Sequence, residues 1–296
     1  HAMQGRVQRR KQLENDLKLA IEHDHLHMEY EPIVDLCSGE LLSLEAHLCW
    51  NHPIHGCIES TEFNPIAEDC GLVSELTSWM LGTTCGQLRH WQHERGNVVP
   101  AALNINLTPK QFALPDLRRI ASEALERSNL QPTCLQFEIT ESALADNMTD
   151  ATRRIEQLRQ FGARVAIDHF GVGLSSFTSL HRLPVDSLKI DRSMLADLQH
   201  SAQAASLIHG LAVIVRNLGI SLVAVGIENA DQLIALQGLG CDSAQGGYFG
   251  RPMIAESLGP FLRDPANRSY HTRGAAAFTL QWAERLAGPT IVDNTL

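Results

Sequence analysis

Positive charge is scarce in this chain. Its 296 residues carry 34 acidic and only 24 basic side chains, which gives a net charge of −10 at neutral pH. Non-specific binding to nucleic acid or to an anionic membrane surface needs clustered positive charge. The charge balance therefore argues against both kinds of surface, and we expect no nucleic-acid partner.

Long apolar runs are lacking as well. No stretch approaches the roughly 20 apolar residues that a membrane-spanning helix needs, and the amino end has no signal-peptide pattern. His1, Ala2 and Met3 have the look of a tag remnant. We therefore expect a cytoplasmic location, either for the whole protein or for the cytoplasmic part of a longer, membrane-attached one.

Paired cysteine motifs are missing too. The seven cysteines form no Cys-x-x-Cys pair, and an odd number cannot all be joined in disulfides. Reduced thiols in the cytoplasm are the simplest interpretation.

What the sequence does contain is an alternation of apolar strand patterns and amphipathic helix patterns. The expected strands lie at 28–35, 41–49, 99–107 and 134–139, then up to Asp168 and up to Lys189, and finally at 220–226 and near 243. The expected helices lie at 4–22, 60–69, 73–94, 109–128, 148–161, 174–182, 202–218, 229–238 and 255–263. Eight strands with helices between them can close a barrel. The predicted fold is of the α/β class, a TIM-like (β/α)8 barrel.

Polar side chains stand near the carboxyl ends of these strands. An apolar strand runs into Asp168 and a glycine-rich turn, and the next strand ends in Lys189. Earlier strands end in Glu45, Asn106 and Glu138. In a barrel of alternating strands and helices these ends converge on one face, which carries the chemistry.

The residues around these strand ends resemble those of a known family. Seven segments match the EAL family of cyclic-di-GMP phosphodiesterases in order and spacing, over about Leu13 to Leu262. They are Tyr30-Glu31-Pro32-Ile33-Val34-Asp35, Leu44-Glu45-Ala46-His47-Leu48-Cys49-Trp50, Asn106-Leu107-Thr108-Pro109-Lys110-Gln111-Phe112, Phe137-Glu138-Ile139-Thr140-Glu141-Ser142, Asp168-His169-Phe170-Gly171, Leu188-Lys189-Ile190-Asp191 and Gln245-Gly246.

The resemblance implies metal-dependent hydrolysis of a phosphodiester, in which two Mg²⁺ or Mn²⁺ ions polarise the phosphate and activate a water. Hard divalent cations prefer oxygen ligands. At the matching positions this chain has oxygen-bearing side chains sufficient for one ion: Glu45, Asn106, Glu138 and Asp168.

Other matched positions imply roles in catalysis and ligand binding. Lys189 corresponds to the lysine that helps to position the attacking water, and Glu141 to the glutamate that braces the loop after Asp168. The residues implied for ligand binding stand on the second strand and near the last one: Glu45, His47, Cys49 and Gln245.

Several positions depart from the family pattern. His169 replaces a second aspartate, and Val225 replaces a glutamate that serves the metal site or acts as base. Cys49 stands where the family has an arginine that contacts the dinucleotide, and a thiol cannot replace a guanidinium fork. His47 replaces the leucine of the family motif, and Glu31 replaces a glutamine. The resemblance therefore predicts a degenerate member with vestigial catalytic residues and at most one bound Mg²⁺ or Mn²⁺.

The expected domain organisation follows from the span of the match. Residues 1–12 would be a tag remnant and the start of a linker helix, 13–264 an EAL domain, and 265–296 a C-terminal extension. In the extension, 275–286 has helical periodicity with an apolar face. That helix would either pack on its own barrel or dock a partner or a second copy.

Three functions stay open at this point. The first is a catalytically degenerate EAL domain that acts as a regulatory or receptor module for cyclic-di-GMP. The second is a slow or unusual metal-dependent phosphodiesterase that uses His169. The third is a protein-interaction scaffold that has lost the nucleotide. The partners to expect are cyclic-di-GMP, an upstream regulatory domain or partner protein, and a second copy in a homodimer.

The two histidines have alternative explanations as well. His47 shares the inward face of Glu45, and His169 follows Asp168 at the same mouth. Two imidazoles beside two carboxylates could favour a transition metal over Mg²⁺. Alternatively, both histidines fill the vacated space and form hydrogen bonds there.

Overall fold

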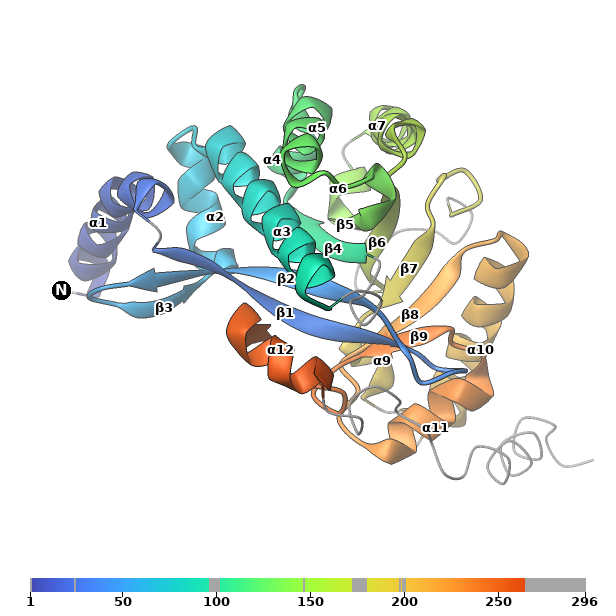
Figure 1. Ribbon diagram of the computed structural model, residues 1–296. Coiled ribbons are helices and arrows are strands. Elements are labelled where there is room, and N and C mark those ends of the chain that lie inside the picture. Colours follow the sequence, from blue (N-terminus) through green and yellow to red (C-terminus); the bar gives the residue numbers. More distant parts are fainter. Residues whose placement is uncertain are drawn as a thin grey trace, which may run out of the picture.

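The computed structural model describes residues 2–23, 25–95, 102–145, 147–171, 180–196, 198 and 201–263 (Figure 1). The expected helix at 275–286 and most of the expected helix at 174–182 lie outside the described residues. No helix within the described ranges is long and apolar enough to cross a bilayer.

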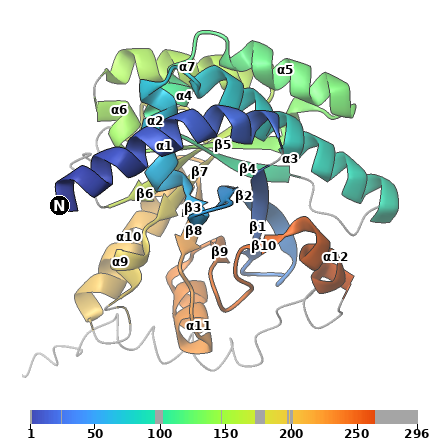
Figure 2. The same cartoon turned by 90° about the vertical axis from the view of Figure 1, so that its left-hand side faces the viewer.

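Ten strands form one sheet that closes into a barrel (Figures 1 and 2). The strand order is β10-β1-β9-β8-β7-β6-β5-β4-β2-β3, and a pairing of β1 with β2 closes the ring. Because β10 and β3 stand outside the ring, eight strands remain in the barrel, which confirms the predicted TIM-like fold. The strands are β1 (Leu26–Asp35), β2 (Leu41–His52), β3 (Gly56–Glu59), β4 (Ala102–Leu107), β5 (Leu135–Thr140), β6 (Arg164–Phe170), β7 (Ser187–Ile190), β8 (Ser221–Val225), β9 (Ser243–Gln245) and β10 (Met253–Ile254).

Within the barrel, the first strand runs against the direction of the other seven. β1 pairs antiparallel with both β2 and β9, whereas the pairs from β2 through β4 to β9 are parallel. The cause is the tight turn between β1 and β2, since a hairpin makes its two strands antiparallel. There Asp35 Oδ1 accepts hydrogen bonds from the backbone N–H groups of Cys37 and Ser38, and Gly39 takes a φ of +74° that suits glycine.

Helices cover the outside of the barrel (Figures 1 and 2). They are α1 (Ala2–Glu22), α2 (Ser60–Asp69), α3 (Val73–Arg95), α4 (Pro109–Phe112), α5 (Leu117–Ser128), α6 (Ser142–Ala145), α7 (Met148–Phe161), α9 (Arg192–Leu195), α10 (Ala202–Asn217), α11 (Ala230–Leu239) and α12 (Ala255–Arg263), with a 3₁₀ turn at Pro132–Cys134. Local chemistry sets several ends: Asn147 and Asn229 cap the starts of α7 and α11. Gly162 and Gly240 end the same helices in the left-handed conformation.

Three local expectations were wrong. The helix expected at 109–128 is two helices, α4 and α5, because Pro115 between them cannot continue a helix and disfavours helical geometry at Leu114. The strand expected at 41–49 extends to His52, since its last residues pair with β3. The short strands β3 and β10 were not expected at all.

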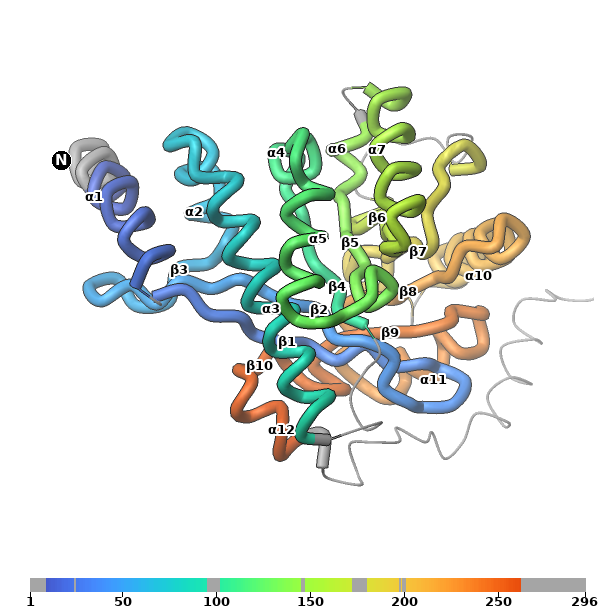
Figure 3. Tube along the Cα trace, turned by 45° about the horizontal axis from the view of Figure 1, so that its top comes forward, coloured from blue at the N-terminus to red at the C-terminus, as the bar shows by residue number. Residues whose placement is uncertain are grey.

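The N-terminal helix packs on one end of the barrel. α1 lies against α2 and the projecting part of the β1–β2 hairpin (Figures 1 and 3). Leu13 and Leu17 are buried, and Ile21 packs against the core. Beside them the buried His52 donates from Nε2 to Asp16 at 3.1 Å, while its Nδ1 accepts from the backbone N–H groups of Ile54 and His55.

We predict that α1 contributes to the stability of the barrel. Leu17→Ala should lower the free energy of unfolding by about 2–5 kcal/mol, as a large-to-small change at a fully buried position does. Leu19→Ala is the matched control on the same helix, because Leu19 is 48% exposed, and its effect should stay within about 0.5 kcal/mol. Urea denaturation measures both, and equal effects of the two substitutions would show that α1 does not belong to the core.

Candidate functional site

The carboxyl ends of the barrel strands surround a pocket of about 450 Å³. Six of the predicted site residues line it: Glu45, His47, Asn106, Asp168, Lys189 and Gln245. The wall also includes Glu31, His169 and Val225. The fold therefore brings together strand-end residues that lie up to 200 positions apart along the chain.

The ammonium group of Lys189 lies at the centre of this site. Its Nζ donates to Glu45 Oε2 and to Glu138 Oε2, both at 2.6 Å, and all three side chains are buried. Burial by itself would lower the pKa of Lys189, but the charges of Glu138 and Glu45 raise it above its usual value. Lys189 is therefore fixed as a cation between two carboxyl groups.

The two glutamates respond to this shared cation in opposite ways. Burial and the charge of Glu45 raise the pKa of Glu138 to about 8, against the attraction of Lys189. Burial also acts to raise the pKa of Glu45, but the charges of Lys189 and His47, with hydrogen bonds from Lys189 and Gln245, lower it to about 2. One ammonium cannot neutralise two buried carboxylates, so Glu138 is the one that retains a proton more readily.

Amide side chains orient both carboxyl groups. Asn106 Nδ2 donates to Glu45 Oε1, and Gln245 Nε2 donates to Glu45 Oε2 at 2.6 Å. Asn104 Nδ2 donates to Glu138 Oε1 at 2.7 Å. Asn104 was missed from the sequence, although its spacing of two from Asn106 on β4 places both amides on one face. All four oxygens of Glu45 and Glu138 thus accept hydrogen bonds.

The carboxyl end of β6 presents Asp168 and His169. His169 has a φ of +54°, in the left-handed region, and its side chain is 57% exposed. Its Nδ1 lies 2.9 Å from Asp191 Oδ2, and its Nε2 lies 3.5 Å from Asp168 Oδ2. Glu141 Oε2 accepts from the backbone N–H of Gly171 at 3.4 Å, and its role in bracing the loop after Asp168 stays a prediction.

Asp191 is a second residue that was missed. It follows β7, caps α9 and reaches His169 only because β6 and β7 are neighbours in the barrel. Burial acts to raise its pKa, but hydrogen bonds from Ser193 and His169 lower it to about 2. The charged Asp191 therefore engages the ring nitrogen of His169 that points away from Asp168.

His47 connects two carboxylates at the pocket wall. Its Nε2 lies 3.2 Å from Glu31 Oε2, and its Nδ1 lies 3.9 Å from Glu45 Oε1. Burial opposes protonation, but the hydrogen bond with Glu31 and the charge of Glu45 raise the pKa of His47. Ligand atoms of Glu31, Glu45 and His47 lie within 4.8 Å of one another. Side chains able to hold a divalent cation are therefore present at the barrel mouth.

The four predicted metal ligands fit a cation less simply. Their oxygen atoms suit Mg²⁺ or Mn²⁺. Lys189 already takes one oxygen of Glu45 and one of Glu138, so an ion would share these carboxylates with the ammonium. Glu138 also lies beneath the pocket wall instead of lining it. The ligand roles assigned from the sequence, and the number of ions, stay predictions.

Cys49 lies farther along β2 than the pocket. It shares a strand face with Glu45 and His47 but does not line the pocket. Burial and the nearby Glu29 and Cys57 raise the pKa of the Cys49 thiol to about 12. Its predicted contact with a ligand stays a prediction.

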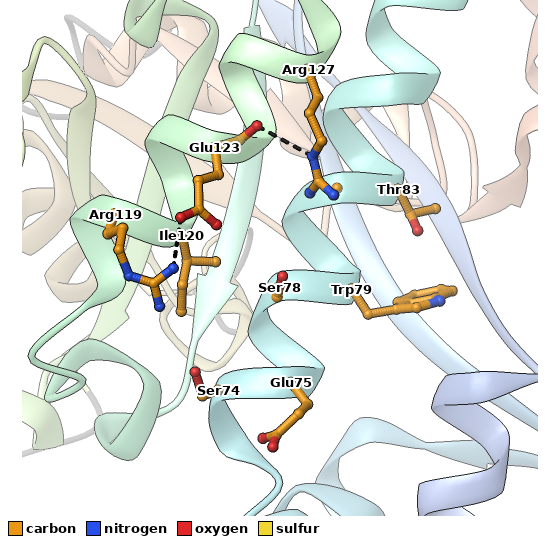
Figure 4. Close-up of a pocket in the computed structure, with 10 residues that line it drawn as sticks. Ser74, Glu75, Ser78, Trp79, Thr83, Arg119, Ile120, Glu123 and Arg127 are labelled. Atoms are coloured by element: carbon orange, nitrogen blue, oxygen red, sulfur yellow. Dashed lines mark hydrogen bonds and ion pairs between the residues drawn. The ribbon is translucent and has the colours of Figure 1, made fainter.

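A larger hollow of about 740 Å³ lies elsewhere, between α3 and α5 on the outside of the barrel (Figure 4). Arg119 pairs with Glu123 at 2.7 Å, and Arg127 donates to the backbone carbonyl of Glu123. None of the strand-end residues described above lines this hollow. It is a groove between two helices, and the barrel mouth remains the candidate site.

Comparison with known proteins places this geometry in context. The family model described as EAL domain matches residues 14–252. The chain is 37% identical over 257 residues to the bifunctional diguanylate cyclase/cyclic di-GMP phosphodiesterase MucR of Pseudomonas aeruginosa, which is 87% of this chain and 37% of that protein. It is 34% identical over 255 residues to the cyclic di-GMP phosphodiesterase NbdA of the same organism, which is 85% of this chain and 32% of that protein.

A solved structure gives the same result. The P. aeruginosa MucR phosphodiesterase in complex with c-di-GMP superposes with a TM-score of 0.77 and 38% identity, covering 83% of this chain and 99% of that one. The curated full-length relatives are much longer. The chain spans about a third of the length of those it matches.

We predict that Glu138 and Glu45 differ in how their loss affects stability. Glu45→Gln should cost about 3–5 kcal/mol near pH 7, because it deprives a buried ammonium of its ionised partner. The raised pKa of Glu138 means that its favourable contribution is present below its usual pKa near 4.5 and is lost as the pH rises through about 8. Because Gln does not titrate, the free energy of unfolding of Glu138→Gln should rise relative to that of the wild type by up to roughly 2 kcal/mol between pH 6 and 8, at ~1.4 kcal/mol per pH unit.

Denaturant unfolding of the wild type and both variants at pH 6, 7 and 8 measures these differences. Groups that the three proteins share cancel in the comparison. A difference in the free energy of unfolding between Glu138→Gln and the wild type that stayed constant with pH would contradict the raised pKa of Glu138.

Proposed function

The chain belongs to the EAL domain family, and on this premise we propose that it is a regulatory module that binds cyclic-di-GMP at the barrel mouth without hydrolysing it efficiently. The observation that carries the proposal is Val225. It ends β8, lines the pocket and stands opposite Gln245 in the sheet register. Its side chain has no lone pair to bind a cation or to accept a proton.

His169 does not compensate for this loss. The family resemblance places a metal-bridging aspartate at its position, but the imidazole is largely exposed and its Nδ1 is engaged by Asp191. Hydrolysis by two metal ions requires stabilisation of both the attacking and the leaving oxygen. Loss of such stabilisation costs several kcal/mol of barrier, on the order of 10²–10³ in rate for one donor.

Features of the pocket support retained binding. Its volume of about 450 Å³ lies within the usual range of ligand sites, roughly 300–1,000 Å³. The amides of Asn106 and Gln245 line it. Gln245 Oε1 is buried and has no hydrogen-bonding partner among the described residues, so it can accept a hydrogen bond. The MucR structure named above is a c-di-GMP complex.

The charge of the mouth sets a condition on binding. Glu31, Glu45 and Asp168 line the pocket, and the ammonium of Lys189 is already paired with carboxylates. A ligand with two phosphates therefore faces net negative charge. When bound here, a divalent cation such as Mg²⁺ or Mn²⁺ would neutralise that repulsion. We infer that cyclic-di-GMP binding depends on such a cation, with Asp168 and Glu45 among its ligands.

The proposed module would be part of a longer signalling protein. This proposal rests on the chain spanning about a third of its curated relatives, whose names include a diguanylate cyclase. In that setting the barrel would report the nucleotide to a neighbouring domain or partner protein. The slow-phosphodiesterase and scaffold alternatives are outcomes of the two experiments that follow.

We predict that the wild type does not convert cyclic-di-GMP to the linear dinucleotide above background with Mg²⁺ or Mn²⁺, as measured by chromatography of the products. The double variant His169→Asp/Val225→Glu should gain activity beyond the sum of the two single variants, because both new carboxylates would serve one metal. Turnover by the wild type at a typical enzymatic rate, on the order of 1 per second or more, would instead establish an active phosphodiesterase.

We predict that calorimetry detects cyclic-di-GMP binding in the presence of Mn²⁺ or Ca²⁺ and much weaker binding in excess chelator. Asp168→Asn should reduce this cation dependence, because it removes both a charge and a ligand. Cys49→Arg should strengthen binding through a charge-assisted phosphate contact, with Cys49→Ser as the matched control. If the wild type and Cys49→Arg both fail to bind at high nucleotide concentration, the scaffold function is to be preferred.

A further inference from the structure

Beyond the barrel mouth, the hairpin of β1 and β2 carries a second group of side chains of the types that can bind metal ions. Alternate residues of a strand share one face, and the register pairs Glu31 with Glu45, Glu29 with His47, and His27 with Cys49. The first pair belongs to the pocket. The last pair lies on the part of the hairpin that also pairs with β3, since Cys49 stands opposite Glu59.

Three ligand types converge at this end. A ring nitrogen of His27, a carboxylate oxygen of Glu29 and the sulfur of Cys49 lie within 4.8 Å of one another. The closest recorded approach is 3.6 Å, between His27 Nε2 and Glu29 Oε1. Cys57 of β3 is the diagonal cross-strand neighbour of Cys49, because Cys49 pairs with Glu59 two residues farther along β3, and it brings a second sulfur to this face. We call these four residues the ribbon cluster.

The imidazole of His27 has no hydrogen-bonding partner for its Nδ1 within the described residues. Its Nδ1 is buried without a hydrogen-bonding partner, and its Nε2 is too far from Glu29 for a hydrogen bond at 3.6 Å. Burying a polar nitrogen without a partner carries a cost. A metal ion bound through Nδ1 would remove that cost.

The ligand set is the kind that zinc prefers. Zn²⁺ binds Cys sulfur at about 2.3 Å, and His nitrogen and carboxylate oxygen at about 2.0–2.2 Å, usually as a tetrahedron. These bond lengths place the ligand atoms roughly 3.3–3.7 Å apart, so the observed spacing needs only small side-chain movements. Thiolate and imidazole select a borderline metal over Mg²⁺ or Mn²⁺, which prefer oxygen.

We propose that the ribbon cluster binds one Zn²⁺ ion through His27, Glu29 and Cys49, with Cys57 as the fourth ligand. On binding, the two thiols release their protons and coordinate as thiolates. The ion would join β1, β2 and β3 on the face opposite Trp50, whose side chain is fully buried. It would leave the barrel mouth free for harder cations, because no cysteine lines the pocket.

Cobalt substitution tests this directly, because Co²⁺ bound to thiolate gives an absorption band that an oxygen and nitrogen site cannot give. Reduced, chelator-treated protein would be titrated with Co²⁺ and then with Zn²⁺ as competitor. We expect one equivalent of Co²⁺ to produce the thiolate band and one equivalent of Zn²⁺ to abolish it. A titration without that band would overturn the proposal.

Variants identify the ligands. Cys49→Ser and His27→Gln should each weaken Zn²⁺ binding more than about tenfold, since even changes that only disturb supporting groups cost 10–100-fold. Cys57→Ser should reduce the thiolate band, and an unchanged band would remove Cys57 as fourth ligand. Cys37→Ser is the matched control, because Cys37 is an exposed thiol at the opposite end of the hairpin.

Two further results would contradict the proposal. One is an undiminished thiolate band in Cys49→Ser, and the other is a Cys49–Cys57 disulfide that persists under reductant in mass spectrometry. Circular dichroism of each variant checks that the fold is retained. Failure of cyclic-di-GMP binding would leave the cobalt result unaffected, so the two hypotheses fail separately.

Discussion

The buried ammonium of Lys189, held between Glu45 and Glu138, is the interaction on which the candidate site depends. It ties β7 to β2 and β5 across the barrel, and each of its two contacts is 2.6 Å long. Charged groups are tolerated in such a place only when they are paired and hydrogen-bonded. Asn104, Asn106 and Gln245 supply those hydrogen bonds, so the amides and charges form one network.

This network also limits the chemistry of the mouth. Because Glu138 retains a proton and Lys189 pairs with the ionised Glu45, the negative charge that faces a ligand lies mainly at the rim, with Glu31 and Asp168. His47 offsets some of that charge through its contact with Glu31. A phosphate ligand thus depends on an additional cation. The second cation of a hydrolytic site has no carboxylate at position 225, where Val225 stands, and the imidazole of His169 is engaged by Asp191. Val225 at the end of β8 and His169 at the end of β6 thus disfavour turnover, whereas the pocket can still bind the nucleotide.

The sequence predicted the barrel and the strand-end set well, because both depend on local patterns in a fixed order. The bounds of α2 and α7 also agree with the helical patterns expected at 60–69 and 148–161. Long-range partners did not follow. Asp191 meets His169 only through the adjacency of β6 and β7, and the unsatisfied imidazole of His27 is visible only once its strand pairs are known. The broken helix at Pro115 was a local signal that helical periodicity obscured.

The most direct test of this account is a crystal structure of the chain soaked with cyclic-di-GMP and Mn²⁺. The account predicts an intact cyclic dinucleotide at the barrel mouth, a single cation contacting Asp168 and Glu45, and Lys189 still between its two glutamates. A linear dinucleotide in the pocket, or two fully occupied ions less than about 4 Å apart, would contradict it.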